Sequence, residues 1–242
     1  MKKSLWLLLV SLVACAPRAG VTTIPDPAVE AKIAEAGVLL GKSCYLPLQR
    51  AWRTYAELYA LPAFRKRVAV PFLKTSLLLA VRERDLGFVT PVYLNQALRL
   101  VETEPALAGF RLYVEMVGFM APRTRGVIQD IDTTFGWTVT RDKMTANWAQ
   151  LHQQAASDEF AAYILAGLNC SYGRFSEKWQ DPALYLKIFP DSPLMKYRVA
   201  ICGEENGDLL RELLAREPEF AEVHFHLGEL ALREGQVLSA ER

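Results

Sequence analysis

The chain has 242 residues, of which 51% are hydrophobic, and its 28 Lys and Arg side chains nearly balance its 27 Asp and Glu side chains. This length suffices for one compact domain or two small ones with a sizeable buried core. Basic and acidic residues alternate along helix-like stretches, which indicates solvated helix surface. We therefore do not expect a nucleic-acid partner, because binding of nucleic acid needs a concentrated basic face.

The first residues have the pattern of an export signal. Lys2 and Lys3 precede an apolar run over residues 5–14, which is too short to span a bilayer comfortably. The run ends in Leu12-Val13-Ala14-Cys15, which resembles the Leu-x-Ala/Gly-Cys lipobox of bacterial lipoproteins. An ordinary signal peptide that is cut elsewhere is the alternative.

The lipobox resemblance implies that residues 1–14 are removed and that Cys15 becomes an acylated N-terminus. Two or more acyl chains make a stable membrane anchor, whereas one chain is marginal. Residue 16 is Ala rather than Asp, which in a Gram-negative host favours the periplasmic face of the outer membrane. Residues 15–28 are rich in Pro, Gly and Thr, and we expect them to tether the folded part to the lipid.

Three cysteines remain after Cys15: Cys44, Cys170 and Cys202. An odd number allows at most one disulfide and leaves at least one free thiol. None of them stands in a Cys-x-x-Cys spacing, so we expect buried thiols that behave as small hydrophobic side chains.

Apolar residues recur with helical spacing through most of the remaining chain, and strand-like alternation is rare. This predicts an all-α fold of antiparallel helical hairpins. An N-terminal helical region is expected over residues 29–121, with Gly87 as a helix stop. A C-terminal helical region is expected over residues 143–242. The predicted helices are 28–40, 45–61, 64–88, 92–104, 107–120, 143–156, 158–170, 181–189, 192–202, 208–217 and 221–234.

Residues 122–142 differ from the rest, because they are rich in Thr, Gly and Asp and alternate briefly around Trp137 and Val139. They predict an irregular insert, either a long loop or a small hairpin, and long loops in compact domains are often functional. Carboxylates and basic residues in this segment are candidate contacts to a ligand or partner, although solvated side chains are the plainer interpretation. The candidates are Arg123, Arg125, Asp130, Asp132 and Trp137.

No other segment matches a phosphate-binding, catalytic or metal-binding motif. The segment from Gly37 to Ser43 is one residue short of a phosphate-binding loop and follows no strand. There is no Gly-x-Ser-x-Gly nucleophile elbow. His224 and His226 would point in different directions on a helix, so they cannot share a metal ion. We therefore expect no catalytic residues, no metal and no cofactor.

The last stretch instead resembles the tetratricopeptide (TPR) repeat, a pair of antiparallel helices. Leu227 and Gly228 stand where the first helix of the motif carries Leu-Gly, Gly235 at the turn, and Ala240 where the second helix carries alanine. Pro218 stands where the motif ends the preceding helix. The motif usually has aromatic residues at the positions of His224 and Ala231, so the sequence departs from it there. A shorter unit with a turn at Gly207 precedes it, so the resemblance extends over about 192–242.

TPR proteins bind peptides or other proteins through a concave helical face and have no catalytic machinery of their own. The sequence therefore predicts a lipid-anchored protein of the bacterial envelope that acts as a non-catalytic scaffold for another envelope protein or peptide. The alternative is a ligand-binding or hydrolytic lipoprotein with its site in residues 122–142.

Overall fold

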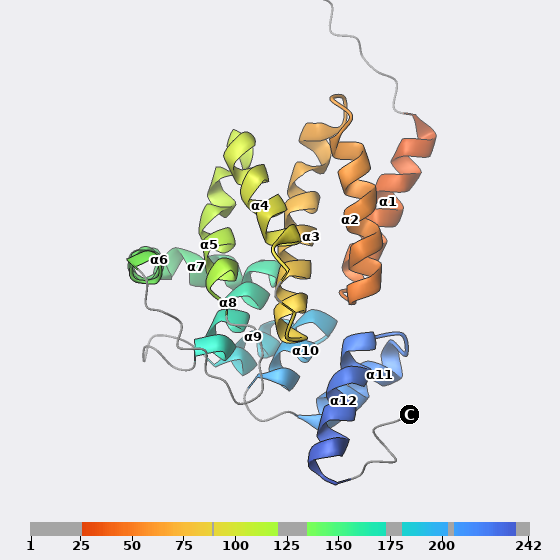
Figure 1. Cartoon of the computed structure of the whole chain (residues 1–242), viewed down its shortest axis with the longest axis vertical. Helices are drawn as coiled ribbons and strands as arrows, with labels where there is room; N and C mark the ends of the chain where they lie inside the picture. Colours follow the sequence, from red (N-terminus) through yellow and green to blue (C-terminus); the bar gives the residue numbers. More distant parts are fainter. Residues whose placement is uncertain (1–25, 89, 121–134, 173–180, 203–205, 236–242) are drawn as a thin grey trace, which may run out of the picture.

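The computed structural model describes residues 26–88, 90–120, 135–172, 181–202 and 206–235, and of residues 135–140 and 171–172 it describes only the backbone. Every regular element in these ranges is a helix (Figure 1). The prediction of an all-α fold is therefore confirmed. The predicted signal peptide, Cys15 and most of the predicted tether lie outside the described residues.

The N-terminal elements form a row of helices in the upper part of Figure 1, where each α-helix packs against the next and runs in the opposite direction. The third helix, α3, lies in the middle, and its residues 75–83 are all buried. Such burial all round a helix marks it as a central one. The elements are α1 (Pro27–Gly41), α2 (Tyr45–Tyr59), α3 (Arg65–Asp85), α4 (Val92–Thr103), the 3-10 helix η1 (Pro105–Phe110) and α5 (Arg111–Phe119).

Local residues explain two helix boundaries. Asp26 accepts a hydrogen bond from the Ala28 amide at 2.9 Å, and Pro27 takes the first helical position of α1. Both features stabilise a first turn. Gly87 follows α3 with a φ of 77°, a left-handed conformation that glycine adopts without strain.

The remaining helices occupy the lower part of Figure 1, with α8 at their centre. Residues 160–168 of α8 are all buried, and the helix contacts α3, α5, α7, α9 and α10. It therefore joins the lower helices to the upper row. The elements are α6 (Phe135–Ala146), α7 (Trp148–Ala155), α8 (Glu159–Tyr172), α9 (Pro182–Ile188), α10 (Pro193–Ile201), α11 (Gly207–Arg216) and α12 (Ala221–Arg233).

The predicted irregular insert is wrong over residues 135–142, which lie in α6, whereas residues 121–134 are outside the described ranges. α6 packs against α5 and is followed after one residue by α7. Threonine and valine favour strands only weakly, and tertiary packing overrides such preferences. The alternation around Trp137 and Val139 is thus part of a helix.

The buried apolar side chains form two cores. The larger one draws on α1 to α9 and on the start of α10. The smaller one joins α10, α11 and α12 around Tyr197, Phe220 and Val223, with Cys44 from the N-terminal half among its members. The division between the cores falls within α10 rather than in the predicted insert.

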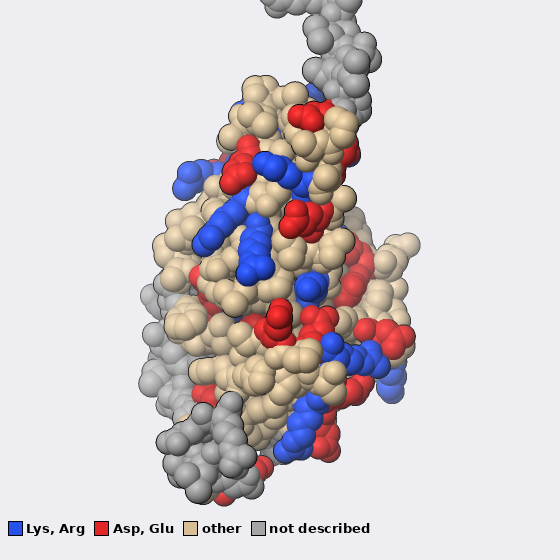
Figure 2. Space-filling view, turned by 90° about the vertical axis from the view of Figure 1, so that its right-hand side faces the viewer, with Lys and Arg blue, Asp and Glu red and all other residues tan. Residues whose placement is uncertain are grey.

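The surface carries mixed charge. Figure 2 shows the side of the molecule that bears α1 and α2, where basic and acidic side chains lie interspersed on a largely uncharged surface. Arg67 of α3 and Glu30 of α1 form an ion pair between two helices. None of the described helices has both the length and the hydrophobicity that are needed to cross a membrane.

Cys170 of α8 and Cys202, which follows α10, form a disulfide, and Cys44 is a buried free thiol. The expectation of unpaired thiols is therefore wrong for two of the three cysteines. The bridge joins residues 32 positions apart and ties the end of α8 to the end of α10. Sequence spacing does not reveal such a pair, because the two residues meet only when the helices pack.

We predict that replacing both Cys170 and Cys202 by Ala lowers the free energy of unfolding by about 2–4 kcal/mol, because the bridge restricts the unfolded chain. Urea unfolding of the oxidised wild type and the double variant measures the difference. Dithiothreitol should lower the stability of the wild type and leave the double variant unchanged. Equal sensitivity of both proteins to the reductant contradicts the pairing.

Candidate functional site

The residues predicted from the sequence fall into two groups. Arg123, Arg125, Asp130, Asp132, Ala240 and Cys15 lie outside the described residues, and Trp137 is placed in α6 without a described side chain. In the second group, Leu227 and Gly228 are half-buried on α12, Gly235 follows α12 with a φ of 74°, and Pro218 lies between α11 and α12. The second group therefore lies on α12 or next to one of its ends.

The histidines do not form a metal site. The exposed His224 places its Nε2 2.9 Å from the carbonyl oxygen of Pro218, whereas His226 is fully buried with its Nε2 3.0 Å from the Tyr197 hydroxyl. His152 is partly buried beside Tyr185, and burial lowers the pKa of its imidazole. In the described part of the chain, no group of three or more His, Cys, Asp or Glu side chains is placed to share a metal ion.

A cluster of buried charges lies where the two cores meet. Arg198 of α10 donates to both carboxylate oxygens of Asp85 in α3, at 2.7 and 2.9 Å, and to the hydroxyl of Tyr163 in α8 at 2.7 Å. Its guanidinium also lies over the Tyr163 ring, 4.5 Å from the centroid. This arrangement ties three helices together through charge-assisted hydrogen bonds, which are the stronger kind.

Arg82 of α3 is the second cation of the cluster and has no exposed surface. Its guanidinium lies 3.7 Å from the centroid of the Tyr197 ring and donates to the carbonyl of Ser43 at 3.0 Å. Its Nε is 3.6 Å from Glu222 of α12, and Glu222 accepts a hydrogen bond from the Tyr45 amide at 2.7 Å. Glu222 thereby connects α12 to both α2 and α3.

The electrostatics of these groups follow from burial and mutual attraction. Burial alone would lower the pKa of the Arg82 guanidinium, but the nearby Tyr163, Tyr197, Glu222 and Asp85 outweigh it and the pKa is raised. Burial raises the pKa of Glu222, while Arg82 and the backbone amides oppose that shift. Arg82 therefore stays charged at every physiological pH.

Buried groups with shifted pKa values are candidates for function, and ion-pair networks shift them as well. Here Arg82 and Arg198 balance Asp85 and Glu222, and each side chain has its partner inside the cluster. The four side chains are at least nine-tenths buried, so no substrate reaches them. The cluster therefore has a structural role, because it links α3, α8, α10 and α12. The expectation that alternating charges mark solvated helix surface is wrong for Arg82 and Asp85.

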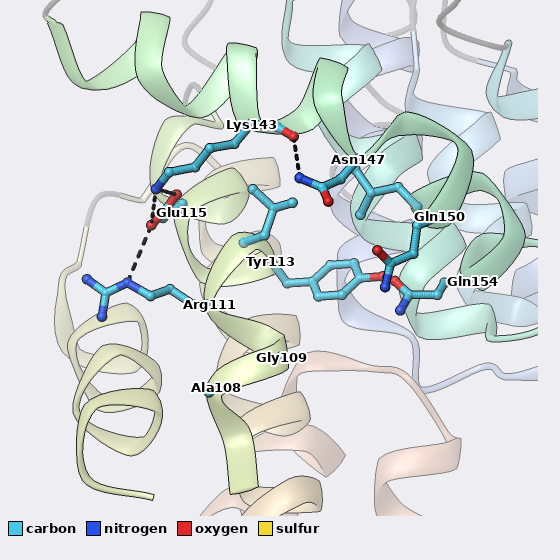
Figure 3. Close-up of a pocket in the computed structure, with 11 residues that line it drawn as sticks. Ala108, Gly109, Arg111, Tyr113, Glu115, Lys143, Asn147, Gln150 and Gln154 are labelled. Atoms are coloured by element: carbon cyan, nitrogen blue, oxygen red, sulfur yellow. Dashed lines mark hydrogen bonds and ion pairs between the residues drawn. The ribbon is translucent and has the colours of Figure 1, made fainter. Parts of the chain in front are cut away.

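An open pocket of about 310 Å³ lies between η1, α5, α6 and α7 (Figure 3). Its inner wall is apolar and its rim is polar. Leu151 and Tyr113 are buried beneath it, because α5 and α7 turn these residues towards the larger core. The lining residues are Ala108, Gly109, Arg111, Leu112, Tyr113, Glu115, Lys143, Asn147, Gln150, Leu151 and Gln154.

Charged side chains gather at one end of this pocket. Lys143 of α6 lies 2.9 and 3.0 Å from the two carboxylate oxygens of Glu115 in α5. Arg111, one helical turn before Glu115, places its Nε 3.4 Å from the same carboxylate. About half of the Arg111 and Lys143 side chains is exposed. Two cations around one carboxylate leave this end with a net positive charge.

Side-chain amides gather at the other end, as Figure 3 shows. Gln154 accepts a hydrogen bond from the Tyr113 hydroxyl at 2.7 Å, and Asn147 donates through Nδ2 to the carbonyl of Lys143 at 2.8 Å. Burial, and secondly the charge of Asp158, raises the pKa of Tyr113 to about 12. The Tyr113 hydroxyl therefore keeps its proton at neutral pH and holds Gln154 in place.

The cations and amides that line this pocket are groups that can bind a ligand. Glu115 is the one carboxylate among its lining residues, and two cations surround it, so the lining holds no pair of carboxylates for acid–base work. The pocket was not predicted from the sequence. The signal was present in Asn147, Gln150 and Gln154, whose spacing of three and four residues places the amides on one helix face.

Protein-family models, curated proteins and solved structures were compared with the chain, and none of them matches it. The function must therefore be inferred from the geometry of the described residues. The pocket combines access from solvent, both signs of charge and polar groups of defined orientation. It is the candidate functional site, and the buried cluster is the frame that supports it.

We predict that Arg198→Met lowers the free energy of unfolding by about 3–5 kcal/mol, because it removes the cation that donates to both carboxylate oxygens of the buried Asp85. The double variant Asp85→Leu/Arg198→Met should recover part of this loss, since it removes both charges. Urea unfolding followed by circular dichroism measures each variant. Arg211→Met, at an exposed ion pair with Asp208, is the matched control. A loss no larger than that of the control contradicts the structural role of the cluster.

Proposed function

We propose that the protein is an exported, lipid-anchored helical scaffold that binds a segment of another envelope protein or a peptide and has no catalytic machinery of its own. The observation that carries this proposal is the open pocket on the helical stack, which is rich in amides and cations and lacks paired carboxylates. Its walls stand on α5 and α7, and both helices pack against the buried α8. Such a preformed site loses little entropy when it binds.

The disulfide supports export. Disulfides persist in oxidising compartments such as the bacterial periplasm and are rare in the cytosol. The Cys170–Cys202 bridge therefore agrees with the export signal, which is an independent feature of the sequence. Acylation of Cys15, proposed from the Leu-Val-Ala-Cys pattern, would hold the exported chain at a membrane.

The C-terminal helices support the scaffold role. α10, α11 and α12 each pack against the next. A Cβ atom added to Gly207, at the start of α11, would lie 3.5 Å from Leu230, near the end of α12, so these two helices are antiparallel. Leu227 and Gly228 lie on α12 and the turn at Gly235 follows it, in the order of the first helix and turn of a TPR repeat, and the second helix of that repeat would fall outside the described residues. We propose a TPR-like unit here, of the kind that serves protein interaction.

We predict that the mature chain begins at Cys15 and carries acyl groups on that residue. Intact mass measurement of the protein extracted from membranes with detergent tests this. Cys15→Ser should prevent both cleavage and acylation, so that the unprocessed chain accumulates. A mature chain that starts at another residue, or one with an unmodified Cys15, contradicts the lipid anchor.

We predict that mild crosslinking of native membranes, followed by purification of this chain, yields a defined partner protein. Reversal of the crosslink and mass spectrometry identify it. An unrelated lipoprotein of similar abundance, treated in the same way, shows which proteins are captured without specificity. A chain that remains free of any specific partner contradicts the scaffold proposal.

A further inference from the structure

We propose that the pocket between α5 and α7 binds an extended peptide that carries a carboxylate, with Arg111 at the carboxylate and the amides of Asn147, Gln150 and Gln154 at the peptide groups. The proposal rests on the scaffold function only in the choice of a peptide over a free metabolite. Three features of the pocket support it: its charge, its hydrogen-bonding groups and its apolar wall.

The charge favours an anionic ligand. Glu115 engages Lys143 through both of its oxygens, whereas its closest contact to Arg111 is to the Nε atom at 3.4 Å. Figure 3 shows the two Nη groups of Arg111 turned away from Glu115, and the side chain is half-exposed, so they remain for a ligand. A guanidinium presents its donors in a planar fork that matches a carboxylate with two parallel hydrogen bonds.

The amides offer both donors and acceptors. Asn147 uses its Nδ2 on the carbonyl of Lys143, which leaves its side-chain oxygen as an acceptor, and Gln154 uses its oxygen on Tyr113, which leaves its NH₂ group as a donor. Gln150, which also lines the pocket, has one group of each kind. Figure 3 shows Gln150 and Gln154 across the pocket from the charged end, with Asn147 between the two ends. A peptide bond needs this combination, because it has one N–H donor and one C=O acceptor.

Other ligand classes fit less well. A phosphate presents mainly acceptors, so it would match the cations and leave the acceptor oxygen of Asn147 unused. A sugar would stack on an exposed aromatic ring, but Tyr113 is only 5% exposed. The apolar wall of Leu112, Leu151 and Tyr113 suits an apolar side chain beside the carboxylate. The volume of about 310 Å³ is at the lower end for ligand sites, which suits a few residues of a peptide.

A peptide titration followed by NMR tests this directly. The probes are three N-acetylated tripeptides, Ala-X-Ala with Leu, Phe or Lys in the middle, each with a free C-terminal carboxylate and again with a C-terminal amide. At least one acid form should shift the side-chain amide signals of Asn147, Gln150 and Gln154 in a saturable way. Its amide form should bind about tenfold more weakly, because a charge-assisted hydrogen bond is lost.

Variants locate the carboxylate. Arg111→Gln should weaken the acid form about tenfold and leave the amide form unchanged, whereas Arg141→Gln, on α6 but outside the pocket lining, should change neither. Thermal unfolding should be the same for both variants, since both arginine side chains are half-exposed. Equal binding of acid and amide forms, saturation at other signals, no saturation with any probe, or equal binding of acetate would each overturn the proposal.

The peptide titration and the membrane crosslinking can fail independently of each other. If membrane crosslinking captures the same partner with Arg111→Gln as with the wild type, and the peptides do not bind, the pocket proposal fails while the scaffold proposal stands. If the peptides bind as expected and no partner is captured, the scaffold proposal fails and the pocket remains a peptide site.

Discussion

The buried charge cluster of Arg82, Asp85, Arg198 and Glu222 is the constraint on which the rest of the structure depends. Burying a charge is costly unless an opposite charge and hydrogen bonds accompany it. Here the partners come from α3, α10 and α12, with further contacts to α2 and α8. A shift of one helix would weaken the pairing of a buried charge, so the cluster favours one relative arrangement of these elements.

The cluster also determines how the two cores meet. Arg82 lies between the Tyr163 ring of the larger core and the Tyr197 ring of the smaller core, at 5.3 and 3.7 Å from their centroids. The disulfide joins the ends of α8 and α10, the helices that carry Tyr163 and Tyr197. The candidate pocket lies between η1, α5, α6 and α7, and both α5 and α7 pack against α8. The helices that carry its side chains are thereby held in place before a ligand arrives, which lowers the cost of binding.

Much of the secondary structure could be predicted from the sequence, because helical spacing of apolar residues and local stop signals such as Gly87 act over a few residues. The features that failed depend on distant partners. Cys170 and Cys202 become neighbours only through packing, and the short alternation around Trp137 was outweighed by the contacts of α6 with α5.

The charges were misjudged for the same reason. Arg82 and Asp85 belong to a charged run, Arg-Glu-Arg-Asp, that has the composition of a solvated surface. Their partners, Arg198 and Glu222, stand more than 110 positions later. A single sequence gives the types of charged residues but not their pairing. The candidate pocket was missed although its amides have helical spacing, because the charged end comes from α5 and α6 and is assembled only in three dimensions.

We infer that the buried cluster makes α3, α8, α10 and α12 one cooperative unit. Native-state hydrogen exchange of the wild-type protein, resolved to single amides by NMR, measures this most directly. The account predicts that the slowest amides of all four helices exchange with one common opening free energy, equal to that of global unfolding. Exchange of the α12 amides through a separate opening of lower free energy, with α3 and α8 still protected, would contradict it.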